Sequence, residues 1–265
     1  MKIPFFIAYS FCKNSFSGNP AGVCILEKWL SSAELQHLAS QVSLPETAFI
    51  FPNKNNSWSI RWFTPVAELD LCGHATLAAA HILFEEGAIG LNHSFTFSSV
   101  VGKIETKLLE NGSISLNLPC QYLGKTSTSS LLIESLGAYP DEIYLGRDCL
   151  CIFGDEETIH QMKPDFRLLA GLLKVRGIIV SSKTSRIGYH FVSRFFAPSI
   201  GIDEDHATGS SHCMLTPHWG EKFKKTKMVG WQASPNGAEI RCELLQNRVL
   251  LSGNSEIFVR GKMNI

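Results

Sequence analysis

The sequence has no excess of charge of one sign. Its 24 lysines and arginines balance 24 aspartates and glutamates in 265 residues. A protein that binds nucleic acid through a broad basic face needs surplus cations to neutralise phosphates. The balance argues against that class, and no nucleic-acid partner is expected. With 45% hydrophobic and 18% charged residues, the chain is also too apolar to stay disordered.

Long apolar runs and dense cysteine are missing as well. The apolar stretches fall short of the ~20 residues that a membrane-spanning helix needs, so we expect no membrane partner. The first residues, MKIPFFIAYSFCKNSF, lack the pattern of a secretion signal. We interpret them as a buried strand and expect a cytoplasmic protein. Eight cysteines without a C-x-x-C motif are too sparse for a disulfide scaffold.

Periodicity and turn residues predict a mixture of helices and strands. A helix is expected over 34–42, capped by Ser31 or Ser32. A second helix should begin near Gly73 and end at Gly87, and its alanine-rich body is typical of a helix buried on most sides.

The chain also shows one strong hairpin signal and one candidate boundary. Asn111-Gly112 lies between two alternating runs, which is typical of a hairpin turn. The small polar residues of 123–130 resemble a domain linker. We therefore predict an N-terminal half, residues 1–122, and a C-terminal half, residues 123–265, whose last strand could return to the first half.

Two segments of the sequence match each other. The first runs from Arg61 as R-W-F-T-P, an acidic loop and C-G-H-A-T-L-A-A-A. The second runs from Arg194 as R-F-F-A-P, an acidic loop and T-G-S-S-H-C-M-L. Such a repeat predicts a duplicated unit. The expected fold is α+β, with two pseudo-symmetric halves, each a mostly antiparallel sheet wrapped around a central helix.

The repeat places Gly73 and Gly209 at the start of a helix in each half. Unpaired backbone N–H groups and the positive end of the helix dipole gather at such a position. Glycine also lets a ligand approach the backbone closely. We therefore predict a cleft between the halves that binds a small anion, with a carboxylate as the expected substrate group.

Four motifs carry a resemblance to a known family. They are F-S-G-N-P-A-G-V (16–23), P-E-T-A-F (45–49), R-W-F-T-P-V-A-E-L-D-L-C-G-H-A-T-L-A (61–78) and E-D-H-A-T-G-S (204–210). Together they resemble the phenazine-biosynthesis PhzF-like isomerase family, which shares the diaminopimelate epimerase fold. The resemblance implies a homodimeric enzyme without metal or organic cofactor, acting in the cleft between its halves. Its best-understood member isomerises a dihydro-hydroxyanthranilate by moving a hydrogen along the ring.

The resemblance implies three catalytic residues. Glu46 would be the base that removes and returns a proton, and apolar neighbours such as Phe49 would favour its protonated form. His74, on the first helix turn, would handle a proton or contact the substrate. We expect His74 to be neutral, because the helix dipole disfavours an imidazolium there. Asp205 would act as an acid from the second half.

The substrate-binding residues follow in the same way. The resemblance implies backbone donors at Gly73 and Gly209, a contact from Ser210, and a binding role for Asn19. One departure stands beside Asp205, where His206 replaces the proline usual in the family, removing a backbone restriction and adding a titratable group.

No metal site is predicted. Four possible ligands lie near the two motifs, but their spacing fits no familiar zinc motif. These residues are Cys72, His206, His212 and Cys213.

Two other functions stay open from the sequence. A two-base amino-acid racemase or epimerase of the same fold needs opposed thiols at the two helix starts. Cys72 fills the first place, but the repeat puts Thr208 at the second, and its hydroxyl is too weak an acid. A non-enzymatic binding protein on this scaffold is the other alternative. A scaffold alone has no use for all four of the retained residues Glu46, His74, Asp205 and Ser210, which argues against this alternative.

Overall fold

The computed structural model describes residues 2–15, 17–54, 56–90, 93–121, 123–127, 129–172 and 175–265. The chain divides into two compact units: unit 1 is residues 1–118 with 250–265, and unit 2 is residues 119–249. The division therefore lies a few residues before the predicted boundary, and the end of the chain belongs to unit 1. Tyr122 at that boundary, Thr128 in the predicted linker and Phe16 in the first family motif lie outside the described residues.

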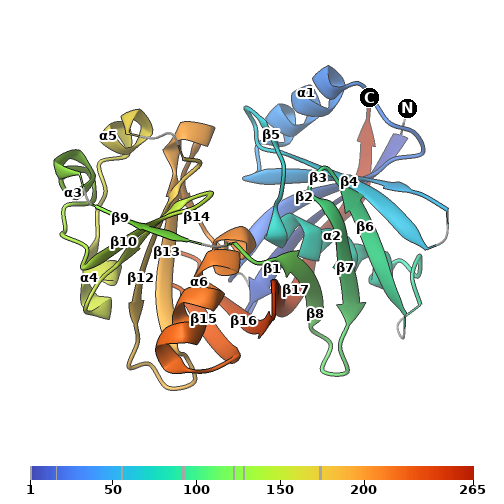
Figure 1. Cartoon of the computed structure of the whole chain (residues 1–265). Coiled ribbons are helices and arrows are strands. Elements are labelled where there is room, and N and C mark those ends of the chain that lie inside the picture. The colour runs from blue at the N-terminus through green and yellow to red at the C-terminus, as the bar shows by residue number, and fades with distance from the viewer. Residues whose placement is uncertain are drawn as a thin grey trace. The chain divides into compact units, whose positions relative to one another are not determined.

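Unit 1 is rich in strands (Figure 1). Its strands are β1 (Lys2–Cys12), β2 (Asn19–Ile25), β3 (Glu46–Pro52), β4 (Ser57–Phe63), β5 (Glu68–Leu69), β6 (Ser94–Ser99), β7 (Gly102–Leu108), β8 (Ile114–Pro119) and most of β17 (Arg248–Asn264). Its helices are α1 (Ser32–Val42) and α2 (Gly73–Glu85). Strand β17 pairs with β1 in antiparallel fashion, which ties the end of the chain to its beginning.

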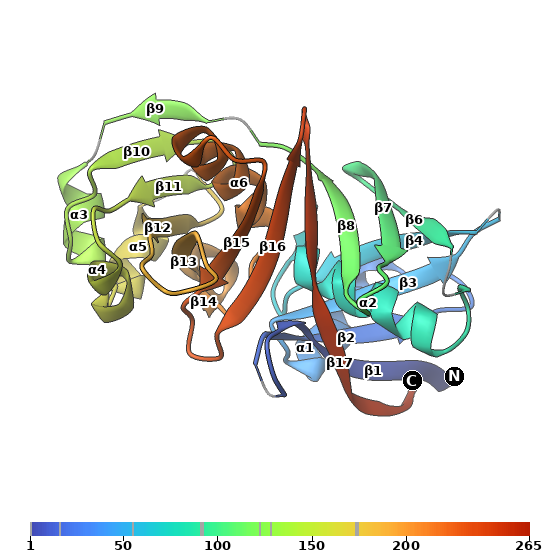
Figure 2. The same ribbon diagram turned by 90° about the horizontal axis from the view of Figure 1, so that it is seen from below.

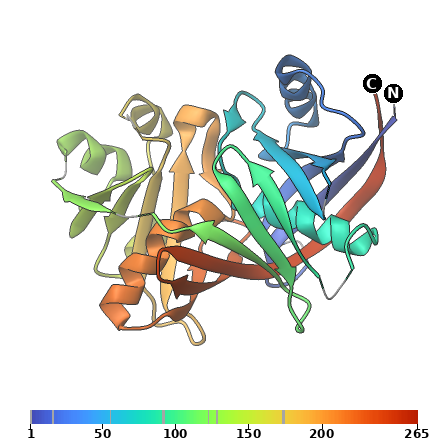
Figure 3. The same ribbon diagram turned by 45° about the vertical axis from the view of Figure 1, so that its right-hand side comes forward.

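Helix α2 forms the core of unit 1. Eleven of its thirteen residues are buried, and it packs against β1, β2 and β3. Figure 3 shows this helix, in cyan, running between the blue and the green strands of the unit. Its run of alanines, Ala78 to Ala80, leaves room for strands to approach closely on more than one side. The helix predicted from Gly73 is thus confirmed, and it ends two residues before Gly87.

Unit 2 contains shorter strands and more helices (Figure 2). Its strands are β9 (Gly124–Thr126), β10 (Glu142–Leu145), β11 (Cys149–Ile152), β12 (Ile178–Lys183), β13 (Phe191–Ala197), β14 (Ile202–Asp205), β15 (Lys227–Gln232) and β16 (Ala238–Leu245). Its helices are α3 (Ser130–Leu136), α4 (Glu156–Gln161), α5 (Phe166–Gly171), α6 (Gly209–Phe223) and the 3₁₀ turn η1 (Pro198–Ile200).

Helix α6 is the buried helix of unit 2. Eleven of its fifteen residues are buried, and it packs against β15 and β16. Pro217 lies inside it and has no N–H to donate to the carbonyl of Cys213, four residues earlier. That carbonyl instead accepts the backbone N–H of Gln121 at 3.0 Å. A segment from outside the helix therefore satisfies the oxygen that the proline leaves open.

The order of strand pairing repeats between the units. In unit 1, β1–β2 is antiparallel, β2–β3 parallel, β3–β4 and β4–β5 antiparallel, β4–β6 parallel and β6–β7 antiparallel. In unit 2, β10 to β16 pair in the same order and directions. This repeat supports the duplication expected from the sequence. A pseudo-symmetric wrapping of the two halves stays a prediction. Within the described ranges, no helix is both long and apolar enough to cross a bilayer.

Candidate active site

Two of the predicted residues of unit 1 stand at the first positions of neighbouring strands. Asn19 begins β2 and Glu46 begins β3, and the parallel register places Glu46 opposite Ala21. Gly18 makes the turn into β2 with a φ of +84°, and a Cβ there would lie 2.3 Å from the carbonyl oxygen of Ser10. Only glycine fits this turn, so the predicted turn cluster delivers Asn19 to the site.

The side chains of unit 1 meet at the start of α2. His74 Nε2 lies 3.0 Å from Glu46 Oε2. On the other side of the ring, Nδ1 lies 3.1 Å from the amide of Asn19. Cys72 Sγ lies 3.5 Å from His74 Nδ1. All four side chains are buried, so the structure brings three predicted residues together and adds the thiol of Cys72.

The expectation that His74 is neutral was wrong. Burial opposes a charge on the ring most strongly, but the attractions of Cys72 and then Glu46 outweigh it and hold the pKa of His74 well above its usual value. The neighbours that raise the pKa are thus Cys72, at the N-cap of the helix, and then Glu46, whose carboxylate lies 3.0 Å from Nε2. The amide nitrogen of Asn19 faces Nδ1. A half turn of the amide exchanges its nitrogen and oxygen, and the oxygen would then accept the Nδ1 hydrogen of a protonated ring.

In unit 2, Asp205 is the last residue of β14 and is buried. Its Oδ2 accepts a hydrogen bond of 2.6 Å from the hydroxyl of Thr208. Gln232, at the end of β15, donates to the backbone carbonyl of Asp205 at 2.6 Å and accepts from the N–H of Thr208 at 2.7 Å. Gln232 therefore fixes the loop that presents Asp205. Sequence reasoning missed it, because nothing in its local sequence indicates this contact.

Ser210 is held by a buried ion pair that the sequence also did not reveal. Arg176 donates to Ser210 Oγ at 2.9 Å and binds both carboxylate oxygens of Asp148. Asp148 is fully buried. The three residues are distant in sequence, so only the fold joins them. The arrangement places the ion pair beside the first turn of α6, where the guanidinium orients the hydroxyl of Ser210.

The starts of α2 and α6 differ from those of the other helices. Gly73 and Gly209 are their first residues, and neither helix has a hydrogen bond from the side chain of its N-cap residue, Cys72 or Thr208. Helices α1, α3, α4 and α5 are each capped by a serine or aspartate side chain. The N–H groups that open α2 and α6 thus remain available to another acceptor.

The possible metal ligands near the second motif do not come together. His212 is buried and donates its Nδ1 hydrogen to the carbonyl of Thr208 at 2.8 Å. Burial lowers its pKa to about 4, so the ring is neutral at pH 7. Cys213 faces the helix backbone at Gly209 O. In the part of the chain that is described, Glu46, Cys72 and His74 are the donors that cluster.

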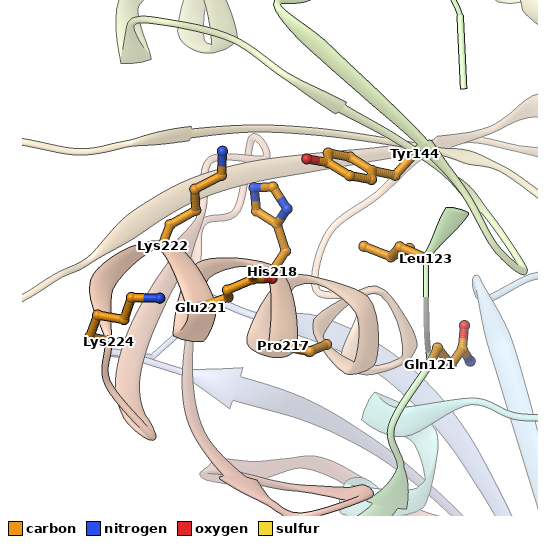
Figure 4. Close-up of a pocket in the computed structure, with 8 residues that line it drawn as sticks. All are labelled: Gln121, Leu123, Tyr144, Pro217, His218, Glu221, Lys222 and Lys224. Carbon is orange, nitrogen blue, oxygen red and sulfur yellow. The ribbon is translucent and has the colours of Figure 1, made fainter. Parts of the chain in front are cut away.

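A separate hollow of about 480 Å³ lies in unit 2 beside α6 (Figure 4). Tyr144, Leu123 and Pro217 line it together with His218 and Lys222. Tyr144 and His218 make an edge-to-face contact with ring centroids 5.1 Å apart. Burial, and then Lys222, lowers the pKa of His218 to about 4. None of the predicted site residues lines this hollow.

The chain is similar to proteins of one family over nearly its whole length. A model of the phenazine biosynthesis-like protein family matches residues 9–261. An uncharacterized isomerase of Halalkalibacterium halodurans is 39% identical, with 99% of each chain covered. The crystal structure of a PhzF-family phenazine biosynthesis protein from Enterococcus faecalis superposes with a TM-score of 0.92 at 37% identity, covering 100% of both chains. A predicted epimerase from Pseudomonas aeruginosa shares the fold, with a TM-score of 0.80 at 15% identity over 99% of each chain.

Proposed function

Because the chain belongs to the phenazine biosynthesis-like protein family, we propose that it is an isomerase that moves a proton between two carbons of a small carboxylate. The resemblance drawn from the four sequence motifs is thereby confirmed. The class of reaction agrees with the relatives, several of which are named isomerases. The substrate and the residue roles below belong to the proposal.

The ion-pair contact between Glu46 and His74 supplies the acid–base chemistry. Glu46 takes a proton from a substrate carbon, and the positive charge on His74 stabilises the carboxylate before transfer. The same proton, or one from solvent, then returns to a second carbon of the substrate. Both side chains are buried, so water does not compete for them and their interaction is stronger than it would be in solvent.

The uncapped N-termini of α2 and α6 are the reason for proposing that the substrate has a carboxylate. Among the described α-helices, α2 and α6 lack side-chain caps, and these are the helices that begin at the repeated glycines. Their unpaired N–H groups and dipoles favour a negative group. A substrate carboxylate in that position would also stabilise charge that develops as the carbon loses its proton.

The two units act on one substrate molecule in this proposal. Unit 1 supplies Glu46, His74 and the donors at Gly73. Unit 2 supplies Asp205, the hydroxyl of Ser210 and the donors at Gly209. The repeated motif supports this division, because each copy presents a glycine at a helix start beside buried polar groups. The reaction needs neither a metal nor an organic cofactor, since a carboxylic acid moves the proton by itself.

The test follows a proton from solvent into the product. Purified protein is mixed with trans-2,3-dihydro-3-hydroxyanthranilate in D₂O, and the ultraviolet spectrum and product mass are recorded. We expect a spectral change with deuterium on a ring carbon, and a loss of at least about 10²-fold in Glu46→Gln, the typical range for general-base removal. Glu110→Gln, an exposed turn glutamate, is the matched control and should keep full activity.

A second pair of variants tests the role of unit 2. Asp205→Asn should lose activity, whereas Asp203→Asn, on an exposed position of the same strand, should not. Turnover that persists in Glu46→Gln contradicts the assigned base. If the wild type converts neither this probe nor any of a panel of small unsaturated carboxylates, and exchanges none of their carbon-bound hydrogens, the isomerase proposal is wrong.

A further inference from the structure

The start of α2 holds three side chains of the types that bind zinc. Within the described ranges, the ligand atoms of Glu46, Cys72 and His74 all lie within 4.8 Å of one another, and all three residues are buried. A thiolate, an imidazole and a carboxylate are the protein ligands of zinc. The sequence did not reveal this set, because Glu46 lies on β3 and reaches the helix only in the folded protein.

The distances suit a tetrahedral ion after small movements. Zinc bonds of about 2.3 Å to sulfur and about 2.0–2.2 Å to nitrogen or oxygen place neighbouring ligand atoms roughly 3.3–3.6 Å apart. Cys72 Sγ lies 3.9 Å from His74 Nε2, and that nitrogen lies 3.0 Å from Glu46 Oε2. Shifts of a few tenths of an ångström bring these two separations to the values of a zinc site, and Sγ lies within 4.8 Å of the Glu46 carboxylate.

Two neighbouring features favour an ion at this point. The Oε2 atom of Glu46 is buried and lies 3.0 Å from His74 Nε2, so an ion bound by these two atoms would take the place of their direct contact. The amide of Asn19 lies 3.1 Å from Nδ1 of the same ring. A half turn of that amide would point its oxygen at Nδ1, and histidine ligands of metals commonly donate their second N–H to such an oxygen, which fixes the ring and the tautomer.

We propose that Cys72 Sγ, His74 Nε2 and a carboxylate oxygen of Glu46 form a binding site for zinc or a similarly thiophilic divalent cation, and that the bound ion shuts off the enzyme. As the ion binds, the thiol proton of Cys72 and the Nε2 proton of His74 leave to the buffer, so that a thiolate and a neutral imidazole hold the metal, and no electron is transferred. Inhibition rests on the proposed function, because the ion occupies the groups that would move the substrate proton.

Cobalt provides a direct test, since a thiolate bound to Co²⁺ produces a charge-transfer band in the near ultraviolet. The reduced protein, in a phosphine reductant that does not compete for the metal, is titrated with Co²⁺ and then with Zn²⁺. We expect a saturable band at one ion per chain that zinc displaces. Substitution of a residue that only orients a metal ligand typically weakens metal binding 10–100-fold, and loss of a ligand itself should weaken it more. Glu46→Gln and His74→Asn should therefore bind Co²⁺ at least about 100-fold more weakly.

Two cysteine variants decide whether the thiol is a ligand. Cys72→Ser should lose the band, while Cys24→Ala should keep it, because Cys24 is an equally buried thiol of unit 1 outside the cluster. Thermal melting of each variant confirms that it is folded. A band that survives Cys72→Ser, a band lost in Cys24→Ala, or cobalt binding without a band in the wild type overturns the proposal.

The metal proposal and the proposed function fail in different ways. The cobalt spectrum requires no substrate, so it decides the metal site even if no substrate is found. Where the isomerase assay works, a micromolar excess of Zn²⁺ should abolish turnover and a chelator should restore it. Full activity in the zinc-saturated protein overturns the inhibitory role. An active enzyme that binds no cobalt overturns the metal site and leaves the isomerase intact.

Discussion

The N-terminal turns of α2 and α6 have the same backbone features, but the pKa values of their buried histidines shift in opposite directions. Each helix begins with a glycine, lacks a side-chain cap and carries a buried histidine in its first turns. His74 lies 3.0 Å from Glu46, and its pKa is raised. His212 donates to the Thr208 carbonyl and packs against Phe191, and its pKa falls to about 4. Duplication thus repeated the backbone, while the charge of each histidine depends on the side chains around it: Cys72 and Glu46 at His74, and an uncharged buried setting at His212.

A second pair of features shows what the repeat did preserve. Arg61 binds both carboxylate oxygens of Glu68 at 2.7 Å, and Arg194 binds both oxygens of Glu204 at 2.8 Å. The arginines that open the two matching segments therefore hold the acidic loops in the same way. These loops lead into the buried helices, so the acidic residues noted in the sequence serve the scaffold of each unit.

The largest expected difference concerns activity. His74→Asn should lower kcat by about 10²–10⁴-fold, because it removes the positive partner of Glu46 in proton transfer. His212→Asn removes a histidine of similar burial that has no acid or base beside it, and should change kcat by less than about tenfold. Both are measured in the isomerase assay at pH 7. Equal losses in the two variants would mean that the histidines act in the same way.

The two arginine pairs should differ in stability. The Arg194 and Glu204 side chains are 11% and 12% exposed, whereas those of Arg61 and Glu68 are 25% and 37% exposed. Arg194 also donates to the carbonyls of Ile159 and Met162.

Arg194→Met leaves the largely buried carboxylate of Glu204 and the carbonyls of Ile159 and Met162 without their hydrogen-bond donor. It should therefore lower the free energy of unfolding by about 3 kcal/mol. Arg61→Met, at the more exposed pair, should lower it by about 1 kcal/mol. Urea unfolding followed by tryptophan fluorescence measures both. A larger loss in Arg61→Met would contradict the assignment of burial as the cause.

The pH dependence of stability should have opposite signs at the two histidines. His212 has a folded pKa of about 4 against about 6.5 unfolded, so the unfolded chain binds the proton first and stability falls as pH drops. The loss from this residue between pH 7 and pH 5 is about 2 kcal/mol. His74 has a raised pKa, so its stabilisation is complete below about pH 6.5 and is lost as pH rises through the folded value.

Urea unfolding of the wild type and the two asparagine variants at pH 5, 7 and 9 separates these contributions. His212→Asn should flatten the loss of stability toward pH 5. The destabilisation caused by His74→Asn should shrink between pH 7 and pH 9. An unchanged acid slope in His212→Asn would show that this ring is not held neutral by the fold.

The smallest expected effect distinguishes isomerase from racemase. The Cys72 thiol has no counterpart thiol at the repeated position, which is Thr208. A one-base isomerase should therefore keep at least about a tenth of its rate in Cys72→Ser. A tenfold loss of rate corresponds to about 1.4 kcal/mol in the barrier, which is the scale of a single missing contact. A two-base racemase would lose nearly all of it. The variant is assayed for isomerase turnover without added metal. Exchange of the α-hydrogen of amino acids is measured in parallel, because a racemase would catalyse this exchange and would lose it in Cys72→Ser.

Local sequence predicted the elements that depend on local physics. Ser31, one of the two caps expected, is the N-cap of α1 and forms a capping box with Glu34. The Asn111-Gly112 turn joins β7 to β8 with a φ of +80° at Gly112. These signals involve residues within a few positions of each other. The charge of His74 was predicted wrongly, because the helix dipole is visible in the sequence and the distance to Glu46 is not.

The sequence by itself determined the family, the duplicated pattern and the types of residue available for chemistry. Motifs and spacing carry that information, since they record which residues follow one another. The tertiary structure decided which of those residues meet: Glu46 with Cys72 and His74, Arg176 with Ser210, and Gln232 with the loop of Asp205. These contacts join residues 26 or more positions apart, and their energies depend on distances and burial that only the packed sheets and helices fix.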